Sequence, residues 1–399
     1  MAPMVGYTHP SFRHLMRLLS REAILYSEMI KTTDLLAAEN KQEQLLARGA
    51  AGLQNVSGRE VLQLGGDNID DLQRCCRMAR QFNYDEINLN CGCPSIETNA
   101  HFGASLMRDP QRVALLLEKM SSSCQPIPIS IKCRIGVHEQ RSQDMDYQDS
   151  YENLHKFVSV VAKHVSSIII HARSAVLQGL DPEKNRSVPP LRYDYVEAIA
   201  REFPGVNIVL NGGISVVNDT MVARESRLGG VMVGRQLLRS PFDLLDSTTG
   251  KDNHYDLAGK EEAAERAMHH YARYATAELS RQSGSSSAIE VILPLVLLFQ
   301  SLLIDEPGTI SMSRLGVRQL KLVMQVMVPV LAIASSTSSL LALLKNVENE
   351  LNVANDDDEE RIIYSSNLMK KVVKEILGKK IMSKVKKNCQ ESSSGITVK

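Results

Sequence analysis

Residues 86–95 read EINLNCGCPS, and this stretch is the most informative part of the 399-residue chain. Residues 86–90 form an apolar run that predicts a buried strand, and the glycine and proline that follow end it abruptly. Cys93 is therefore expected to project from a turn at the carboxyl end of that strand, where a thiol is placed for chemistry. The alternative is that Cys91 and Cys93 are small hydrophobic side chains that fill space in the core, as most free cysteines are.

Short apolar runs alternate with segments of helical periodicity over roughly the first 240 residues. There are eight such runs, at residues 1–5, 24–30, 61–64, 86–90, 129–134, 168–171, 207–211 and 230–233. Strands that alternate with helices pair in parallel, and eight of them match a closed (β/α)8 TIM barrel. A doubly wound open sheet is the alternative α/β fold.

The barrel is expected to occupy residues 1–245, followed by a polar linker at residues 246–260. Residues 261–351 are rich in helical periodicity and predict a smaller all-helical domain. Residues 352–399 carry an acidic cluster and many lysines, so we expect a charged, flexible tail there. The lysine-rich run within it, residues 370–387, could instead form an amphipathic helix.

Composition narrows the function only slightly. Lys+Arg 46 and Asp+Glu 46 balance, so no overall electrostatic field indicates a partner, and any basic surface must be local. Seven cysteines without the paired spacing of a zinc site favour a reducing compartment and predict no metal site. The longest apolar stretch, residues 291–304, is too short to span a bilayer, which needs about 20 residues. We therefore expect no membrane span and a cytoplasmic location, or an organelle if a transit peptide precedes the present N-terminus.

Polar residues and glycines fall at the carboxyl ends of the predicted strands. Four successive strands have polar residues at or just after their carboxyl ends, namely Gln63, then Asn90 and Cys93, then Lys132 and Arg134, and then His171 and Arg173. The last two strands lead into Asn211-Gly212-Gly213 and Gly234-Arg235, turns whose backbone N–H groups can approach a phosphate. Because these strand ends form the active site of a barrel, side chains far apart in the sequence can converge there. The alternatives are a plain turn for the two adjacent glycines and an ordinary core histidine for His171.

Taken together, these motifs resemble those of the tRNA-dihydrouridine synthases, and they occur in the same order. The matching segments are residues 2–4, 62–66, the turn of Cys93, 131–136, 171–173, 211–214 and 234–235. The run at residues 180–191 further resembles the DusA-type branch, which acts on uridines 20 and 20a of the tRNA D-loop. Lys132, His171 and the glycines would also fit other flavin barrels. An oxidoreductase of a small substrate such as dihydroorotate is therefore the alternative.

The resemblance implies an FMN enzyme that reduces the uracil C5=C6 bond of tRNA, with NADPH as a transient reductant. Reduced FMN would deliver a hydride to C6, and Cys93 would give a proton to C5 as a general acid, since a thiol of ordinary pKa, about 8.5, is mostly protonated at neutral pH. The residues implied to bind FMN are Pro3, Met4, Val5, Gln63, Lys132, His171, Asn211, Gly212, Gly213, Gly234 and Arg235. Those implied to bind tRNA are Asn90, Arg134, Arg173, Lys184, Arg186 and Arg314. The chain is expected to act as a monomer.

The helical region departs from the family pattern at residues 307–314. The branch carries Pro-Gly-x-Arg-x-x-Arg-Arg there, whereas this chain has Ile310 and Ser313 and keeps only the charge of Arg314. Lost phosphate contacts weaken binding in a salt-dependent way. We therefore expect retained flavin chemistry with weaker or altered tRNA docking, which the lysines at residues 370–387 could partly restore.

A second departure is Glu183, which stands where the branch usually has lysine, although Lys184 beside it could compensate. A tRNA-binding protein that has lost catalysis is a third hypothesis. Cys93 and Lys132 argue against it, because both residues that carry the chemistry persist.

Overall fold

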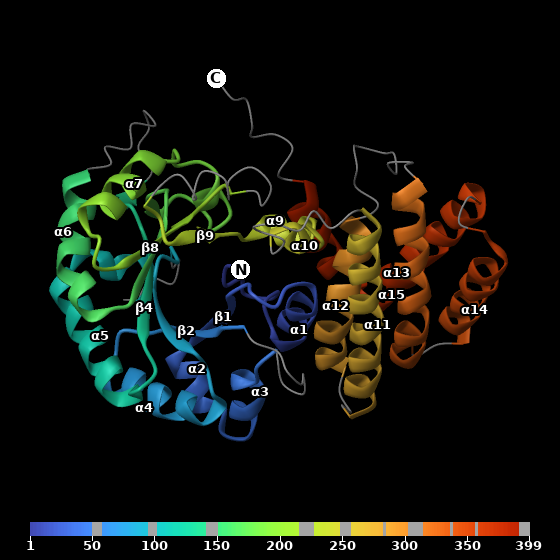
Figure 1. Cartoon of the computed structure of the whole chain (residues 1–399). Helices are drawn as coiled ribbons and strands as arrows, with labels where there is room; N and C mark the ends of the chain where they lie inside the picture. Colours follow the sequence, from blue (N-terminus) through green and yellow to red (C-terminus); the bar gives the residue numbers. More distant parts are fainter. Residues whose placement is uncertain are drawn as a thin grey trace. The chain divides into compact units, whose positions relative to one another are not determined.

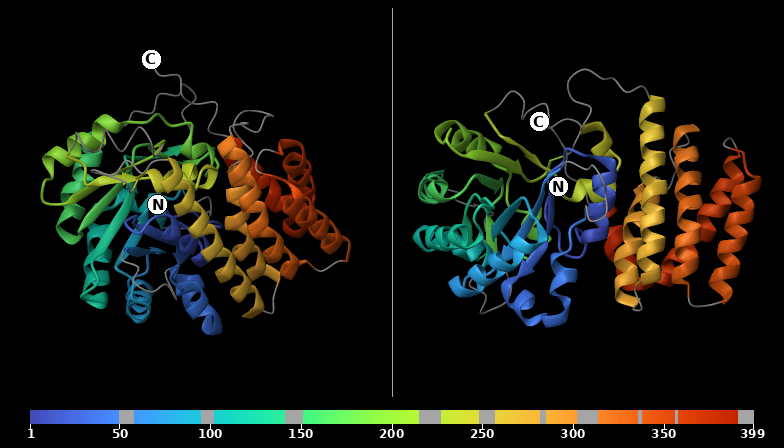
Figure 2. Two further views of the ribbon diagram at one scale, coloured as in Figure 1. Left: turned by 45° about the vertical axis from the view of Figure 1, so that its right-hand side comes forward. Right: turned by 60° about the horizontal axis from the view of Figure 1, so that its bottom comes forward.

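The computed structural model describes most of the chain, drawn in Figure 1 and from two further directions in Figure 2. The described residues are 1–49, 58–94, 102–140, 151–214, 227–247, 257–281, 285–301, 314–335, 338–355 and 358–390. The chain folds as two compact units. The first comprises Met1–Thr8 and Glu22–Gly234, and the second comprises His9–Arg21 and Arg235–Lys399.

The first unit is built on a parallel sheet of seven strands in the order β1-β2-β3-β4-β6-β8-β9 (Figure 1). The strands are β1 Leu25–Lys31, β2 Glu60–Gly65, β3 Glu86–Cys91, β4 Ile129–Arg134, β6 Ser167–His171, β8 Asn207–Asn211 and β9 Gly230–Met232. Every adjacent pair is parallel. Each strand lies within one residue of its predicted bounds. The predicted α/β barrel followed by a helical region is therefore confirmed.

The predicted first strand, residues 1–5, is wrong. This segment is not a strand, although its backbone bridges the two edges of the sheet. The amide of Ala2 donates to the carbonyl of Val233, next to β9, at 2.7 Å, and the N-terminal ammonium of Met1 donates to the carbonyl of Ile24, next to β1, at 2.7 Å. Pro3 follows at once, and because proline has no backbone N–H it cannot continue a hydrogen-bonded ladder.

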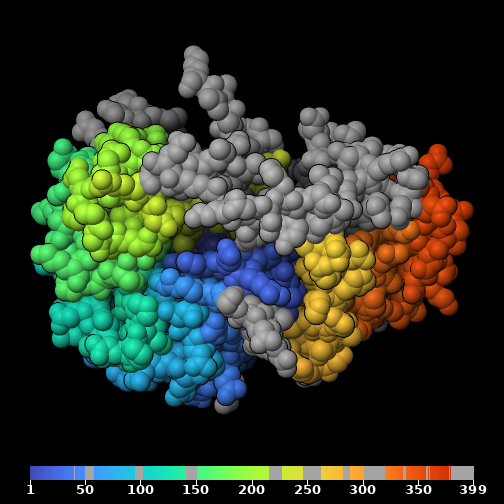
Figure 3. Space-filling view, viewed as in Figure 1, coloured from blue at the N-terminus to red at the C-terminus, as the bar shows by residue number. Residues whose placement is uncertain are grey.

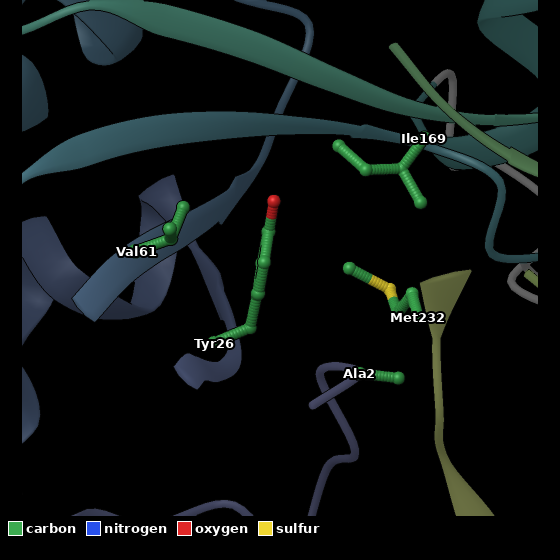
Figure 4. Packing of buried hydrophobic residues seen from close by; sticks show 5 residues of the cluster. All are labelled: Ala2, Tyr26, Val61, Ile169 and Met232. Atoms are coloured by element: carbon green, nitrogen blue, oxygen red, sulfur yellow. The ribbon is translucent and has the colours of Figure 1, made fainter. Parts of the chain in front are cut away.

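Side chains inside the barrel form a buried cluster that contains residues of the N-terminal segment, of both edge strands of the sheet and of strands between them. The cluster consists of Ala2, Tyr26, Val61, Ile169 and Met232, shown as sticks in Figure 4. Burial of each large aliphatic side chain contributes about 1.5–3 kcal/mol. A cluster shared by β1 and β9, the two edge strands, is what a rolled sheet requires.

Helices follow the strands along the chain and cover the outside of the sheet (Figure 2). The α-helices are α2 Thr32–Ala37, α3 Gln42–Leu46, α4 Ile69–Ala79, α5 Pro110–Cys124, α6 Tyr151–Val161 and α7 Tyr193–Glu202, and the 3-10 segments are η1 Glu39–Lys41, η2 Arg80–Phe82, η3 Gly103–Arg108, η4 Ala162–His164 and η5 Lys184–Arg186. The Asn68 side chain caps α4, and the Asp109 side chain caps α5, where Pro110 takes the first helical position.

A second, two-stranded parallel sheet was not predicted. It pairs β5, Val137–Gln140, with β7, Ala175–Gln178. Both strands lie in the segments that follow β4 and β6, beyond the carboxyl ends of the main strands. β5 is short and mostly polar, and the apolar part of β7 is only three residues long, so neither segment was separated from the loops around it.

The second unit is helical, and the part of the chain that the structure describes there contains α1 Pro10–Leu19, α9 Arg235–Arg239, α10 Asp243–Ser247, α11 Leu257–Arg281, α12 Ser285–Ser301, α13 Arg314–Ala334, α14 Ser338–Val353 and α15 Glu359–Gln390. The residues of α11 to α14 are coloured yellow to orange in Figure 3. The N-terminal helix α1 belongs to this unit, and its His14 ring stacks on Tyr274 of α11 with 3.9 Å between ring centroids. None of the described helices is long and apolar enough to cross a membrane.

Two expectations about this region differ from the structure. Helices α10 and α11 extend into both ends of the predicted linker at residues 246–260, whose middle lies outside the described residues. The predicted flexible tail contains α15, which is interrupted at Gly378, where φ is 71°. This segment is helical because apolar side chains at helical spacing form one buried face. Its buried side chains include Ile362, Met369, Val372 and Val373.

Candidate active site

The strand register aligns the predicted site residues along the carboxyl edge of the sheet. The aligned pairs are Asn90 with Lys132, Arg134 with His171, and His171 with Asn211, while Gln63 aligns with Asn88, which was not predicted. Five adjacent strands, β2, β3, β4, β6 and β8, therefore contribute polar residues to one edge, as the barrel prediction requires.

The turn of Cys93 is held on both sides by hydrogen bonds. The Asn90 side-chain oxygen accepts from the amides of Gly92 and Cys93 at 3.1 and 3.0 Å. The Cys93 carbonyl accepts from the amide of Ala104 at 2.8 Å. Beside it, Gly103 has φ of +76°, and a Cβ at that position would collide with the Cys93 carbonyl oxygen. The strand end that the sequence predicted is therefore a tightly shaped turn.

Cys91 and Cys93 have different surroundings. Cys91 is fully buried in β3, and burial raises the pKa of its thiol well above the ordinary value. Cys93 is only half-buried. Cys91 therefore fits the space-filling interpretation, and the chemical role of Cys93 stays a prediction.

Four basic side chains lie close enough to Cys93 to influence its thiol, and they are Arg134, Arg186, Lys132 and Lys31. Burial raises the pKa of the Cys93 thiol, and the four cations oppose this rise without cancelling it. The thiol is therefore protonated at neutral pH, which is the form that a general acid requires. Burial, followed by the nearby Arg134, lowers the pKa of Lys132 to about 8, so its ammonium form still predominates at pH 7.

Arg134 is buried and bonded to backbone carbonyls of three segments. Its Nε donates to the carbonyl of Gly92 at 3.0 Å, and one terminal nitrogen donates to the carbonyls of Ser174 and Asn185 at 3.2 and 2.8 Å. Burial lowers its pKa to about 10, so it stays charged at neutral pH. The structure thus gives Arg134 a part in joining the Cys93 turn to the segments after β6, and its contact with tRNA stays a prediction.

The segment that carries the other predicted tRNA contacts is anchored by Asn185. Its buried side chain donates to the carbonyl of Val176 at 2.8 Å and accepts from the amide of Val176 at 2.7 Å. The neighbouring Arg186 lies within electrostatic reach of Cys93. Lys184 is exposed and forms an ion pair with Asp181 at 3.7 Å. Of these two predicted contacts, Arg186 is the one that the structure brings to the thiol.

Arg173, which ends the turn after β6, donates to the carbonyl of Pro189. It also lies within electrostatic reach of Arg134. These contacts tie the segment after η5 to the end of β6.

Gly212 and Gly213 follow β8 with φ of +111° and +68°. A Cβ on Gly212 would lie 3.3 Å from His171 Nε2, and one on Gly213 would lie 2.8 Å from a methyl group of Leu191. The Tyr193 hydroxyl donates to the Gly212 carbonyl at 2.6 Å. Only glycine suits both the backbone angles and the space, and the turn packs against His171 and Leu191.

The remaining predicted residues are less constrained. The amide of Met4 donates to the Thr8 hydroxyl at 2.9 Å, and Val5 is 67% exposed. Gly234 lies beside Ala2, whereas Arg235 begins α9 in the second unit. Their cofactor roles, like that of Pro3, stay predictions.

Asn211 is buried, and its side chain donates to the carbonyl of Met232 at 2.7 Å. In the helical unit, Arg314 begins α13, but its side chain lies outside the described residues, as do Ile310 and Ser313.

The comparisons with known proteins agree with this arrangement. The family model for dihydrouridine synthases matches residues 1–298. The chain belongs to this family.

Its curated relatives include the tRNA-dihydrouridine(20/20a) synthase of Shewanella oneidensis, 41% identical over 251 residues, which cover 61% of this chain and 68% of the relative. The protein of the same name from Synechocystis is 38% identical over 256 residues, covering 63% and 70%. Among solved structures, morphinone reductase in complex with tetrahydroNAD matches with a TM-score of 0.42 and 10% identity over 65% of this chain and 89% of that one. That structural likeness is too low to carry an argument.

As a dihydrouridine synthase, the chain is an oxidoreductase of a flavin-dependent family, and the residues at the strand ends are compatible with a flavin. The turn of Gly212 and Gly213 has no Cβ atoms to block its backbone N–H groups, which an anionic phosphate group would need as donors. Lys132 adds a half-buried cation near the end of β4. The donor set thus suits an anionic, ring-bearing cofactor.

Lys31 was missed by the sequence analysis. It ends β1, its ammonium lies 5.8 Å from the centroid of the Phe102 ring, and it acts electrostatically on Cys93. The strand predicted at residues 24–30 stopped one residue before Lys31. Its place at a strand end was the signal that could have found it.

Proposed function

We propose that this chain reduces uridine to 5,6-dihydrouridine at positions 20 and 20a of the tRNA D-loop. The observation that carries the proposal is the half-buried Cys93 thiol at the turn after β3, within electrostatic reach of Lys31, Lys132, Arg134 and Arg186. Burial raises the pKa of this thiol by more than the four cations lower it. The names of the relatives, tRNA-dihydrouridine(20/20a) synthases, support the substrate and its position. We further propose FMN as the cofactor and NADPH as the reductant.

When bound, FMN supplies the hydride that is added to C6 of the uracil. Cys93 then donates its thiol proton to C5, so the ring gains one hydride and one proton across a bond that becomes single. Lys132 would stabilise the negative charge that the cofactor carries when it is reduced. Gln63, His171, Asn211 and the Gly212 turn are the groups that would hold the cofactor.

The basic residues around the thiol also suit an RNA substrate. Phosphates are attracted by clustered cations, and Arg186 and Lys31 are only half-buried, so they can meet a phosphate without leaving the site. The single carboxylate of a small substrate such as dihydroorotate would engage at most one or two of the four cations near Cys93. This argues for tRNA over the alternative of a small-substrate flavin oxidoreductase.

The test is reduction of a tRNA transcript by the purified protein with NADPH. Nuclease digestion and mass spectrometry should find dihydrouridine, and a matched transcript with cytidine at positions 20 and 20a should yield none. The protein should release FMN on denaturation. Absence of dihydrouridine from both transcripts and from tRNA of cells that express the chain would overturn the proposal, and release of FAD would overturn the cofactor assignment.

A further inference from the structure

A chain of buried polar side chains runs through the interior of the barrel, from the Cys93 turn toward the opposite ends of the strands. Its members are Asn90, Gln63, Asn88, Ser130 and Glu86, and we call them the interior polar chain. All five are buried, and Asn88 and Ser130 are fully so. Glu86, Asn88 and Asn90 alternate along β3, so their side chains share one face of the strand.

The hydrogen bonds of this chain all run in one direction. Asn90 donates to the Gln63 oxygen at 2.9 Å, Gln63 donates to the Asn88 oxygen at 2.8 Å, and Asn88 donates to the Ser130 hydroxyl at 2.8 Å. Ser130 then donates to a carboxylate oxygen of Glu86.

The two ends of the chain require this same direction. At one end, the amides of Gly92 and Cys93 can only donate, so the Asn90 atom that faces them must be oxygen. At the other end, a carboxylate can only accept, so Ser130 must donate to Glu86. The three side-chain amides between the ends have no freedom to turn over without breaking a bond.

Glu86 is itself held in place. Arg59 donates to its second carboxylate oxygen at 2.6 Å. Burial, and next the nearby Glu86, raise the pKa of the Tyr26 hydroxyl well above its usual range, so Tyr26 remains a neutral donor beside this end. The acceptor end of the interior polar chain is therefore fixed by neighbours on other segments.

We propose that Glu86, Ser130 and Asn88 are positioning residues, which fix the amide orientation of Gln63 and Asn90 and thereby the shape of the Cys93 turn. They touch neither the thiol nor the strand ends where the cofactor would bind. They act through Asn90, whose oxygen holds the Gly92 and Cys93 amides. The proposal deepens the proposed function, because a general acid must be aimed as well as protonated.

The test compares Ser130→Ala with Ser167→Ala in the full chain. Ser167 of β6 is the register neighbour of Ser130, is also buried, and accepts a hydrogen bond from Asn207 at 3.1 Å, outside the interior polar chain. The rate at which iodoacetamide alkylates Cys93 is followed from pH 6 to 10 or so by peptide mass spectrometry. Ser130→Ala should loosen the turn and raise this rate by up to about tenfold, the equivalent of about 1.4 kcal/mol, with the pH midpoint shifted downward as the thiol becomes more exposed.

Ser167→Ala should leave the rate and the midpoint of Cys93 alkylation unchanged, even if it lowers the melting temperature. Glu86→Gln is the second variant, because it preserves the shape of the side chain while adding a donor at the acceptor end. It should change alkylation in the same direction, and it serves if Ser130→Ala does not fold. Alkylation unchanged in a folded variant, or changed equally by Ser167→Ala, would overturn the proposal. Because alkylation needs neither tRNA nor NADPH, this outcome is independent of whether the proposed function fails.

Discussion

The barrel unit and the helical unit both bury many apolar side chains, and the barrel adds a network of buried polar side chains to them. The interior of the barrel contains an amide, hydroxyl and carboxylate chain joined by directed hydrogen bonds. In the helical unit, residues 291–299 of α12 are all apolar and all buried. A directed polar network tolerates few substitutions, whereas an apolar helical core leaves the outer surface free to vary. Most of the predicted site residues that match the family pattern lie in the barrel unit, and the departures at Ile310 and Ser313 lie in the helical unit.

The largest effect should follow from removal of the thiol. Cys93→Ala should lower dihydrouridine formation by about 10²–10⁴-fold, the usual contribution of a general acid, while flavin binding and NADPH oxidation stay largely intact. Mass spectrometry of tRNA and stopped-flow flavin reduction measure the two half-reactions separately.

Cys91→Ala is the matched control for this prediction, because Cys91 lies two residues away and is fully buried. It should affect stability more than turnover. Equal loss of dihydrouridine in the two variants would remove the general-acid role from Cys93.

The next effect separates the two arginines near the thiol. Arg134→Met should lower the free energy of unfolding by about 1–3 kcal/mol for each buried carbonyl left without a donor, and three carbonyls lose one. Arg186→Met should change stability little, because Arg186 is only half-buried, and should instead raise KM for tRNA. Denaturant unfolding and steady-state kinetics decide between these outcomes. A stable Arg134→Met protein with a raised KM would make Arg134 a substrate residue after all.

A smaller effect concerns Lys132. Lys132→Met should slow flavin reduction by about tenfold, because a cation that stabilises developing negative charge is lost. Its pKa of about 8 also predicts a pH dependence with a definite sign. The ammonium is present below that pKa and is lost above it, so the wild-type rate of flavin reduction should fall as pH rises through about 8. The variant should lack this step, and a shared step would assign the titration to another group.

The sequence predicted the strands well because apolar runs of β-favouring residues are a local signal. It could not show how Arg134 is used, because its three partner carbonyls lie in segments far apart along the chain. Asn88 and Ser130 were likewise missed as functional candidates. A polar residue in a strand that is buried on both faces finds its hydrogen-bond partner on another strand. Which strands are neighbours depends on segments far apart in the sequence, so the partner cannot be inferred from the residues around it. The paired β5 and β7 and the role of α1 in the helical unit were invisible for the same reason.

The smallest effect is expected in the helical unit, at the two positions where the family pattern has arginine and this chain does not. The Ile310→Arg, Ser313→Arg double variant should tighten tRNA binding, and each additional phosphate that an arginine neutralises should steepen the fall of log K with log salt by about 0.7–0.9. Thr309→Arg with Ser311→Arg is the matched control, since it adds the same charge at positions outside the pattern. Binding measured from low to moderate salt should show a steeper slope for the first pair than for the second. Equal slopes would mean that added charge acts only through the general field of the protein, and the exposed Lys370, Lys371 and Lys374 of α15 would then be the residues to neutralise next.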